Sequence, residues 1–387
     1  MVKGDVGEKE EATMSKKINT KEQTNQCARG EVRRKIQDFL EGHTVVIWGS
    51  GATMPLGFPS MGDLLDKFVH VSEFREIQDI IGYGFEEKLS KLIAKKGSSE
   101  REVYEDQACK IIGELFNKTE TTNRDGILCG SAKVKEYYQA MLALHAFLSA
   151  QPGIASPKSV DILTTNYDCS WELLFKRNGI PYLDGFSEEQ KGFDYSAFFP
   201  KGDELLTRVV KIHGSDNWFR YGTTAPFVEK VAIGERPSQD SENMVPKIII
   251  PSNLKYEEVS TDITFSNLML TFGRLIKEAK SYLTIGFGFN DQHLTPLLKQ
   301  EAMKGKPVVR LMKDTNRATA GRVFAEGIPN IITLSDAGDS ERGKVRMTSV
   351  TWHKEGATGV FDIFDDDLWA LPSFMKLLNE KPDLINH

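Results

Sequence analysis

Short apolar runs rich in β-branched residues recur along this chain, and segments with helical periodicity lie between most of them. The helical segments place apolar residues three to four positions apart, as the buried face of a helix requires. Strands that alternate with helices form a mostly parallel sheet with helices on both faces. The sequence therefore predicts an α/β fold of this kind. The predicted strands are residues 44–48, 160–165, 208–213, 247–250, 282–286, 308–312 and 331–334.

A long helical stretch interrupts this alternation. Between residues 61 and 155 nearly every periodic segment is helical, with candidate helices at 88–96, 103–116 and 134–150. Residues 119–130 are polar, and we expect them to form a loop between two of these helices. The sequence thus predicts a helical insert or subdomain, residues 61–155, within the α/β fold.

The chain divides into three predicted parts. Residues 1–30 are polar and charged without the apolar centre of a secretory signal, so we predict a mobile N-terminal tail. Residues 31–335 contain the strand–helix alternation and form the main domain, and residues 336–387 remain as a C-terminal appendage. No run of 18 apolar residues occurs, so we expect no membrane span and a cytoplasmic protein.

The charge balance argues against one broad class of function. The 49 Lys and Arg residues against 55 Asp and Glu residues give a net charge of −6, and the isoelectric point is about 5.8. Proteins that bind nucleic acid or anionic membranes through charge are usually basic. We therefore expect no direct nucleic-acid binding and no membrane binding.

The four cysteines, Cys27, Cys109, Cys129 and Cys169, form no recognisable pattern. No two of them make a C-x-x-C pair, so the sequence supports neither a zinc ribbon nor a thioredoxin motif. Scattered cysteines are typical of a reducing compartment. The sequence therefore predicts no metal site.

A glycine-rich segment, Gly49-Ser50-Gly51-Ala52-Thr53, directly follows the first predicted strand. A Gly-x-Gly turn lets the backbone approach a pyrophosphate and offers it amide donors. Met54 stands where a third glycine would complete the dinucleotide-binding fingerprint, and no Gly-Lys-Ser/Thr follows. A tight turn that binds no ligand is the alternative interpretation.

Two further predicted strands end in side chains suited to catalysis. Asn166 follows the second strand, where its amide would orient a ligand or a water molecule, and Asp168 either supports this site or caps the next helix. His213 ends the third strand beside Gly214, where an imidazole would act as a general base. Strand ends of this kind border the ligand site in open α/β sheets, although each residue alone is also compatible with a structural role.

The fourth loop is Gly286-Phe287-Gly288-Phe289-Asn290-Asp291. Its glycines would let the ribose or adenine of a cofactor lie against the backbone. Asn290 and Asp291 would bind ribose hydroxyls or cap the helix that follows.

The order of these four loops, together with Gly57-Phe58-Pro59, resembles the sirtuin-like NAD-binding family over residues 44–335. The resemblance implies a Rossmann-like sheet and makes residues 31–335 an NAD-binding catalytic domain. It is closest to the bacterial sirtuin-like branch of anti-phage defence, which hydrolyses NAD instead of deacylating lysine. Two departures disfavour a deacylase. Ser60-Met61-Gly62 replaces the usual Asp-Phe-Arg, and residues 215–285 lack the four cysteines of the sirtuin zinc module.

The resemblance implies a role for each matching residue. Asn166 and His213 match the catalytic Asn and His of the family. The implied NAD-binding residues are Gly49, Ser50, Gly51, Ala52, Thr53, Phe58, Pro59, Thr165, Asp168, Gly214, Gly286, Phe287, Gly288, Asn290 and Asp291.

The activity that the resemblance implies is hydrolysis of NAD to nicotinamide and ADP-ribose, with NAD as the substrate and no metal. Depletion of NAD would make the protein an effector of anti-phage defence in the bacterial cytoplasm. By resemblance to the stand-alone form of the family, we expect a homo-oligomer with a HerA-type hexameric ATPase as its partner. An NAD-dependent protein deacylase and a non-catalytic NAD or ADP-ribose sensor are the alternatives.

Overall fold

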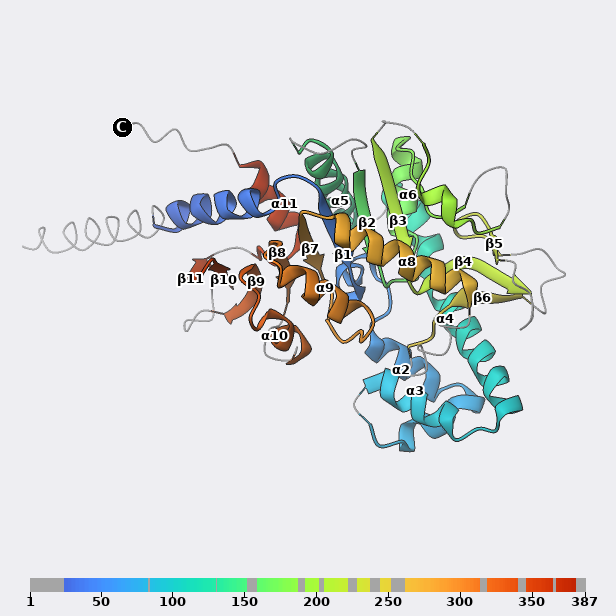
Figure 1. The fold of residues 1–387 in the computed structure, drawn as a ribbon. Helices are drawn as coiled ribbons and strands as arrows, with labels where there is room; N and C mark the ends of the chain where they lie inside the picture. The colour runs from blue at the N-terminus through green and yellow to red at the C-terminus, as the bar shows by residue number, and fades with distance from the viewer. Residues whose placement is uncertain are drawn as a thin grey trace, which may run out of the picture.

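The fold is centred on one twisted sheet with helices on both faces (Figure 1). The computed structural model of the chain describes residues 24–82, 84–129, 131–151, 159–186, 192–201, 205–221, 228–236, 244–251, 262–313, 319–339, 346–364 and 367–380. The helices in these ranges are residues 24–39, α2 (Met61–Val69), α3 (Gly84–Ala94), α4 (Ser98–Cys129), α5 (Ala132–Ser149), α6 (Ser170–Asn178), α8 (Ile263–Glu278), α9 (Leu294–Ala302), α10 (Thr319–Ala325) and α11 (Leu371–Asn379), with 3-10 turns η1 (Ser50–Ala52), η2 (Met54–Leu56), η3 (Ser72–Asp79) and η4 (Tyr195–Phe198).

The main sheet has eight strands in the order β11-β10-β9-β8-β7-β1-β2-β3. Neighbouring strands from β3 through β1 to β9 are parallel, and only β10 and β11 run antiparallel to their neighbours. The predicted Rossmann-like, mostly parallel sheet is therefore confirmed. Its strands are β1 (Thr44–Trp48), β2 (Ser159–Thr164), β3 (Leu206–Lys211), β7 (Ser281–Ile285), β8 (Val308–Met312), β9 (Asn330–Asp339), β10 (Arg346–Lys354) and β11 (Ala357–Phe364).

The sheet separates two hydrophobic cores, because side chains alternate between the faces of a strand. In β1, Val46 and Trp48 enter the core that the helix at 24–39, α5, α6 and α11 cover. Val45 and Ile47 enter the opposite core, beneath α8, α9 and α10. All five residues of β1 are buried, which explains why this strand has no polar alternation in its sequence.

The predicted helical insert is confirmed in type, and its first helix begins as the sequence indicates. Ser60 and Asp63 form a reciprocal capping box at the start of α2. The prediction of a loop at residues 119–130 is wrong, because α4 continues as a helix through residue 129. Two polar side chains there, those of Thr122 and Asn123, make contacts within the helix and beyond it. The Thr122 hydroxyl donates to Lys118 O at 3.0 Å, as threonines in helices often do, and the Asn123 amide donates to Leu56 O at 3.0 Å.

A second correction concerns residues 214–250. From the sequence we expected residues 214–244 to form a long loop, with a hairpin within it as an alternative, and residues 247–250 to form a strand of the parallel sheet. The described residues instead form a separate antiparallel sheet of β4 (Gly214–Tyr221), β5 (Val228–Lys230) and β6 (Met244–Ile248), in the order β5-β4-β6. Gly214 permits the sharp turn from β3 into β4, since its φ is +80° and an added Cβ would lie 2.0 Å from Lys247 O.

The C-terminal segment is built into the domain. Residues 346–364 of the predicted appendage add β10 and β11 to the sheet, and α11 lies along α5 (Figure 1), where Lys376 Nζ contacts Glu136 Oε1 at 2.7 Å.

The predicted N-terminal tail also differs in its last residues. Residues 24–30 are helical, and Asn25 exchanges two hydrogen bonds of 3.1 Å with the backbone of Phe364. Residues 1–23 lie outside the described residues. Among the described helices, none is long and apolar enough to cross a membrane.

Candidate functional site

The sheet order reverses beside β1, where one half of the sheet continues through β2 and the other through β7. In doubly wound sheets, the crevice at such a point holds the ligand, next to the carboxyl ends of the strands. A cavity of about 170 Å³ lies there. The residues predicted from the sequence that line it are Gly49, Ser50, Thr53, Pro59, Thr165, Asn166, His213, Phe287, Gly288, Asn290 and Asp291.

Six other predicted residues are not among those that line the cavity: Gly51, Ala52, Phe58, Asp168, Gly214 and Gly286. Two of the three glycines among them, Gly51 and Gly286, join the loops after β1 and β7. Gly51 N donates to Gly286 O at 3.0 Å, and an added Cβ on Gly286 would lie 2.2 Å from Ala52 N. Gly51 and Gly286 therefore allow the close approach of two backbones.

Ala52 and Phe58 support the cavity from behind. The carbonyl of Ala52 accepts a hydrogen bond from the buried Tyr137 hydroxyl. Phe58 stacks on Phe116 with ring centroids 5.7 Å apart, and Phe116 itself lines the cavity. These residues therefore position the wall of the site without reaching its interior.

Asn166 is held rigidly at the end of β2. Its backbone N donates to Thr164 Oγ1 at 3.0 Å. Its side-chain Nδ2 donates to Gly49 O at 3.0 Å and to Thr53 Oγ1 at 3.1 Å. Both amide hydrogens are thus engaged, and among the described residues no donor is bonded to Oδ1. The carbonyl oxygen of this side chain is therefore the atom suited to accept a hydrogen bond from a ligand or water.

His213 occupies the turn between β3 and β4. Its Nε2 lies 3.1 Å from Asp291 Oδ2, and the two side chains are only 11% and 7% exposed. The other oxygen, Asp291 Oδ1, accepts from His293 N at 2.9 Å and Leu294 N at 3.0 Å at the start of α9. These two bonds secure the start of α9, which is one of the two roles that the sequence left open for Asp291. Its contact with His213 is an addition that the sequence did not indicate.

The helical insert supplies part of the cavity wall that the sequence analysis missed. Leu64 of α2, Glu86 of α3 and Phe116 of α4 line the cavity. These positions carry no motif, since each lies on an ordinary amphipathic helix, and only the packing of the insert brings them to the strand ends. The other lining residues that were missed are Met61, Tyr167, Pro251 and Phe289.

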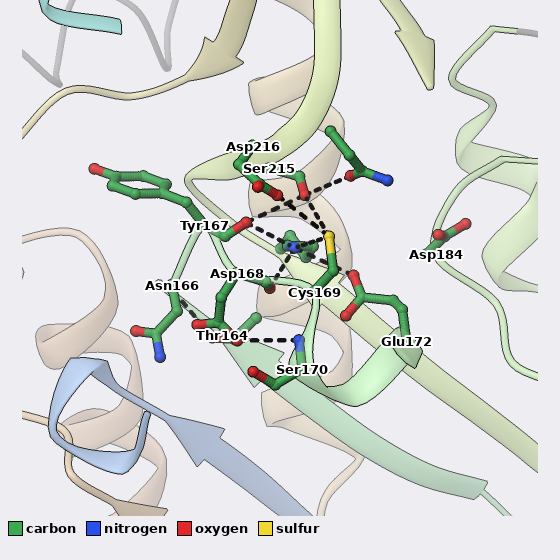
Figure 2. Close-up of polar contacts among 12 residues, drawn as sticks. Thr164, Asn166, Tyr167, Asp168, Cys169, Ser170, Glu172, Asp184, Ser215 and Asp216 are labelled. Atoms are coloured by element: carbon green, nitrogen blue, oxygen red, sulfur yellow. Dashed lines mark hydrogen bonds and ion pairs between the residues drawn. The ribbon is translucent and has the colours of Figure 1, made fainter. Parts of the chain in front are cut away.

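Asp168 belongs to a buried polar cluster next to the cavity (Figure 2). Its Oδ1 accepts from Ser170 N at 3.1 Å, which secures the start of α6. Beside it the fully buried Lys211 donates to Tyr167 O at 3.0 Å and Asp168 O at 2.5 Å, and pairs with Glu172 at 3.2 Å. Lys211 thereby fixes the backbone that follows Asn166.

Burial and charge act in opposite directions within this cluster. Burial raises the pKa of Glu172, and the nearby ammonium of Lys211 only partly opposes it. For Lys211, burial alone would lower the pKa, but the surrounding acidic groups and Cys169 raise it overall. The Lys211 side chain is therefore held among acidic groups beneath the strand ends.

Comparisons with known proteins agree with part of the resemblance. No curated protein matches the sequence. A solved complex of a Sir2 homologue with NAD is 14% identical, with 76% of this chain and 90% of that chain covered and a TM-score of 0.37. A Sir2 protein bound to a propionylated peptide is 13% identical, with 76% and 98% covered and a TM-score of 0.35. Similarities of this size carry no argument about the site. The sequence itself matches the family of SIR2-like domains, and it does so over residues 160–311.

Proposed function

We propose that this chain binds NAD at the cavity and hydrolyses the bond between nicotinamide and ribose, releasing nicotinamide and ADP-ribose. One observation carries the proposal. Asn166, His213 and the glycine-rich loops after β1 and β7 border the same cavity at the switch point of the sheet. The SIR2-like match over residues 160–311, which includes both Asn166 and His213, supports it.

Hydrolysis at this bond passes through an oxocarbenium-like transition state, as in other glycosidic cleavages. The electron pair of the breaking C–N bond moves to the pyridinium nitrogen, so nicotinamide leaves as a neutral molecule. Asn166 Oδ1 would hold a water molecule or a ribose hydroxyl at the anomeric carbon. His213 would accept the proton of the attacking water, and Asp291 would hold the imidazole and stabilise its charged form.

The size of the cavity limits what it encloses. The cavity volume is about 170 Å³. Cavities that hold a whole drug-sized ligand have volumes of roughly 300–1,000 Å³. We therefore assign the cavity to the nicotinamide and its ribose. The adenosine half of NAD would extend from it along the loop at residues 286–291, as the resemblance implies.

We further propose that depletion of NAD makes this protein an effector of bacterial anti-phage defence in the cytoplasm. The motif order of the NAD-hydrolysing branch of the family supports this role. A hydrolase of this kind needs control, so the proposal includes a homo-oligomer and a HerA-type hexameric ATPase as partner. The net charge of −6 favours a partner, and not this chain, as the component that contacts nucleic acid.

The proposal is tested by incubating the purified full-length chain with NAD, with and without a candidate HerA-type ATPase, and measuring nicotinamide by chromatography. We expect release by the wild type and loss of release in Asn166→Ala and His213→Ala. Asn178→Ala is the matched control, since its amide donates only to Leu174 O within α6 among the described residues.

Two results would overturn the proposal. Formation of O-acyl-ADP-ribose that requires an acylated peptide would identify a deacylase instead. Tight binding of NAD or ADP-ribose without turnover, in every oligomeric and partner condition, would identify a sensor.

A further inference from the structure

Three side chains from separate elements meet in the interior behind the strand ends: Glu120 of α4, Cys169 just before α6 and Asp216 of β4. One potential ligand atom from each lies within 4.8 Å of the other two. Their exposed fractions are 1%, 0% and 2%. Figure 2 shows the side chains of Asp216 and Ser215 directed at the Cys169 sulfur.

The distance between two of these atoms matches a tetrahedral metal site. The Cys169 thiol donates a hydrogen bond to Asp216 Oδ1, with the sulfur and oxygen 3.3 Å apart. Zn–S and Zn–O bonds of about 2.3 and 2.0 Å at a tetrahedral angle place sulfur and oxygen about 3.5 Å apart. The two ligand atoms are therefore already spaced as such a site requires.

The Glu120 carboxylate provides an independent observation. Its Oε1 accepts from Cys169 N, so the carboxylate is fixed against the cluster. Its Oε2 is buried and has no hydrogen-bond partner among the described residues. A buried carboxylate oxygen without a partner is costly, and a bound cation would satisfy it. Asp168 Oδ2, in the same region, is also buried without such a partner.

The composition of the cluster suits a cation as well. Four buried carboxyl side chains lie here, Glu120, Asp168, Glu172 and Asp216, beside the buried side chain of Lys211. Lys211 Nζ donates to Cys169 Sγ at 3.5 Å. Groups that hydrogen-bond to the ligands of a metal, without binding the metal themselves, commonly orient those ligands. The Lys211 contact is thus compatible with a metal-bound thiolate.

We propose that Glu120, Cys169 and Asp216 bind one Zn²⁺ ion. A thiolate excludes the hard cations Mg²⁺ and Ca²⁺, which take oxygen ligands, and a mixed set of sulfur and carboxylate suits zinc. The ion would join α4 to the start of α6 and to β4. Asn166 is three residues before Cys169, and His213 is three residues before Asp216, so the ion would anchor both strand ends.

This proposal departs from the sequence prediction of no metal. The ligands are 49 and 47 residues apart along the chain, so they form none of the short-spaced pairs by which metal sites are recognised in sequences. The inference does not depend on NAD hydrolysis, since it is tested by metal content and not by turnover.

The first experiment measures zinc in the full-length protein by plasma mass spectrometry, after expression with added zinc and dialysis against metal-free buffer. We expect about one zinc per chain, because the cluster offers one set of ligands. Cys169→Ser and Asp216→Asn should lose the zinc in the same dialysis. Cys109→Ser, which changes a buried cysteine whose thiol donates to Ile248 O, should retain it.

A second measurement covers the case in which the ligand variants do not fold. Wild-type protein loaded with Co²⁺ should show the near-ultraviolet charge-transfer absorption of a cobalt–thiolate bond, and Zn²⁺ should displace it. The Cys109→Ser variant should give the same spectrum. Wild-type protein without bound zinc and without this absorption would overturn the proposal, as would full zinc content in a folded Cys169→Ser variant.

Discussion

The imidazole Nε2 of His213 lies 3.1 Å from Oδ2 of Asp291, and this contact connects the turn after β3 with the loop after β7. Asp291 is itself fixed, because its other oxygen accepts two backbone N–H groups at the start of α9. The carboxylate beside His213 is therefore held by a helix terminus on the opposite half of the sheet. Under the proposed mechanism, this carboxylate would hold the general base and stabilise its protonated form.

Replacement of Asp291 by Asn should slow NAD hydrolysis while leaving the fold intact. The asparagine oxygen can still accept the two N–H groups of α9, but the negative partner of the imidazole is lost. We expect kcat to fall by roughly 10²-fold, within the ~10²–10⁴-fold that general acid–base catalysis contributes, and KM to change little. Steady-state kinetics and thermal unfolding of the variant check this. A large loss of stability with unchanged kcat per folded molecule would show that Asp291 acts only as a cap.

Thr53→Val should loosen Asn166. The substitution keeps the shape of the side chain but removes the hydroxyl that accepts from Asn166 Nδ2. One hydrogen bond contributes about 1 kcal/mol, and without it the productive position of Asn166 is less favoured. We therefore expect roughly a fivefold to tenfold fall in kcat. Thr122→Val is the control, because its hydroxyl donates to Lys118 O on the exposed side of α4. Equal kinetics for the two variants would argue against this role for Thr53.

Gly49→Ala should destabilise the junction between the β1 and β7 loops. An added Cβ would lie 2.5 Å from Gly286 O and 2.6 Å from Phe287 Cα, and both are backbone atoms that cannot move aside cheaply. We expect a loss of roughly 1–3 kcal/mol in the free energy of unfolding, as for other overpacked sites.

Gly273→Ala is the control for Gly49→Ala, and it should change the stability in the opposite direction. Gly273 lies within α8, and an added Cβ there meets no atom within 4 Å. Alanine is favoured over glycine in a helix by about 1 kcal/mol, so this variant should be more stable than the wild type. Urea unfolding of both variants measures the difference, and equal effects would contradict the close-approach interpretation.

Asp161→Asn should remove a buried ionic contact between β2 and β3. Asp161 accepts two hydrogen bonds from Arg208, at 2.5 and 3.2 Å, and lies 2.6 Å from His43 Nε2. Loss of one member of such a buried pair costs about 3–5 kcal/mol. Glu278→Gln is the control, since Glu278 pairs with Arg274 at the surface and should matter by less than about 1 kcal/mol.

The contribution of Asp161 should also depend on pH. Burial would raise its pKa, but the contacts with His43 and Arg208 lower the pKa overall. A carboxyl with a lowered pKa stabilises the fold above its unfolded pKa of about 3.9 and loses that contribution as the pH falls through the folded value. The stability difference between wild type and Asp161→Asn should therefore shrink below about pH 4. A difference that stays constant under acid would contradict this account.

Local patterns were sufficient to predict most of the main sheet. The strands β1, β2, β7 and β8 were predicted to within one or two residues, because a parallel strand buried on both faces is rich in apolar and β-branched residues. The same local information failed at residues 119–130. Polar side chains there belong to a long helix, and one of them, Asn123, donates a hydrogen bond to Leu56 O. The polarity of a segment alone cannot distinguish such a helix from a loop.

The sequence by itself determined which segments end at the switch point, since the glycine-rich loops and the strand-end Asn166 and His213 are local features. Only the tertiary structure decided what these residues contact. Asp291 meets His213 across two loops, Glu86 and Phe116 reach the cavity from the insert, and Glu120 meets Cys169 and Asp216 in the interior. Periodicity and turn preferences act over a few residues, whereas each of these contacts depends on how distant elements pack.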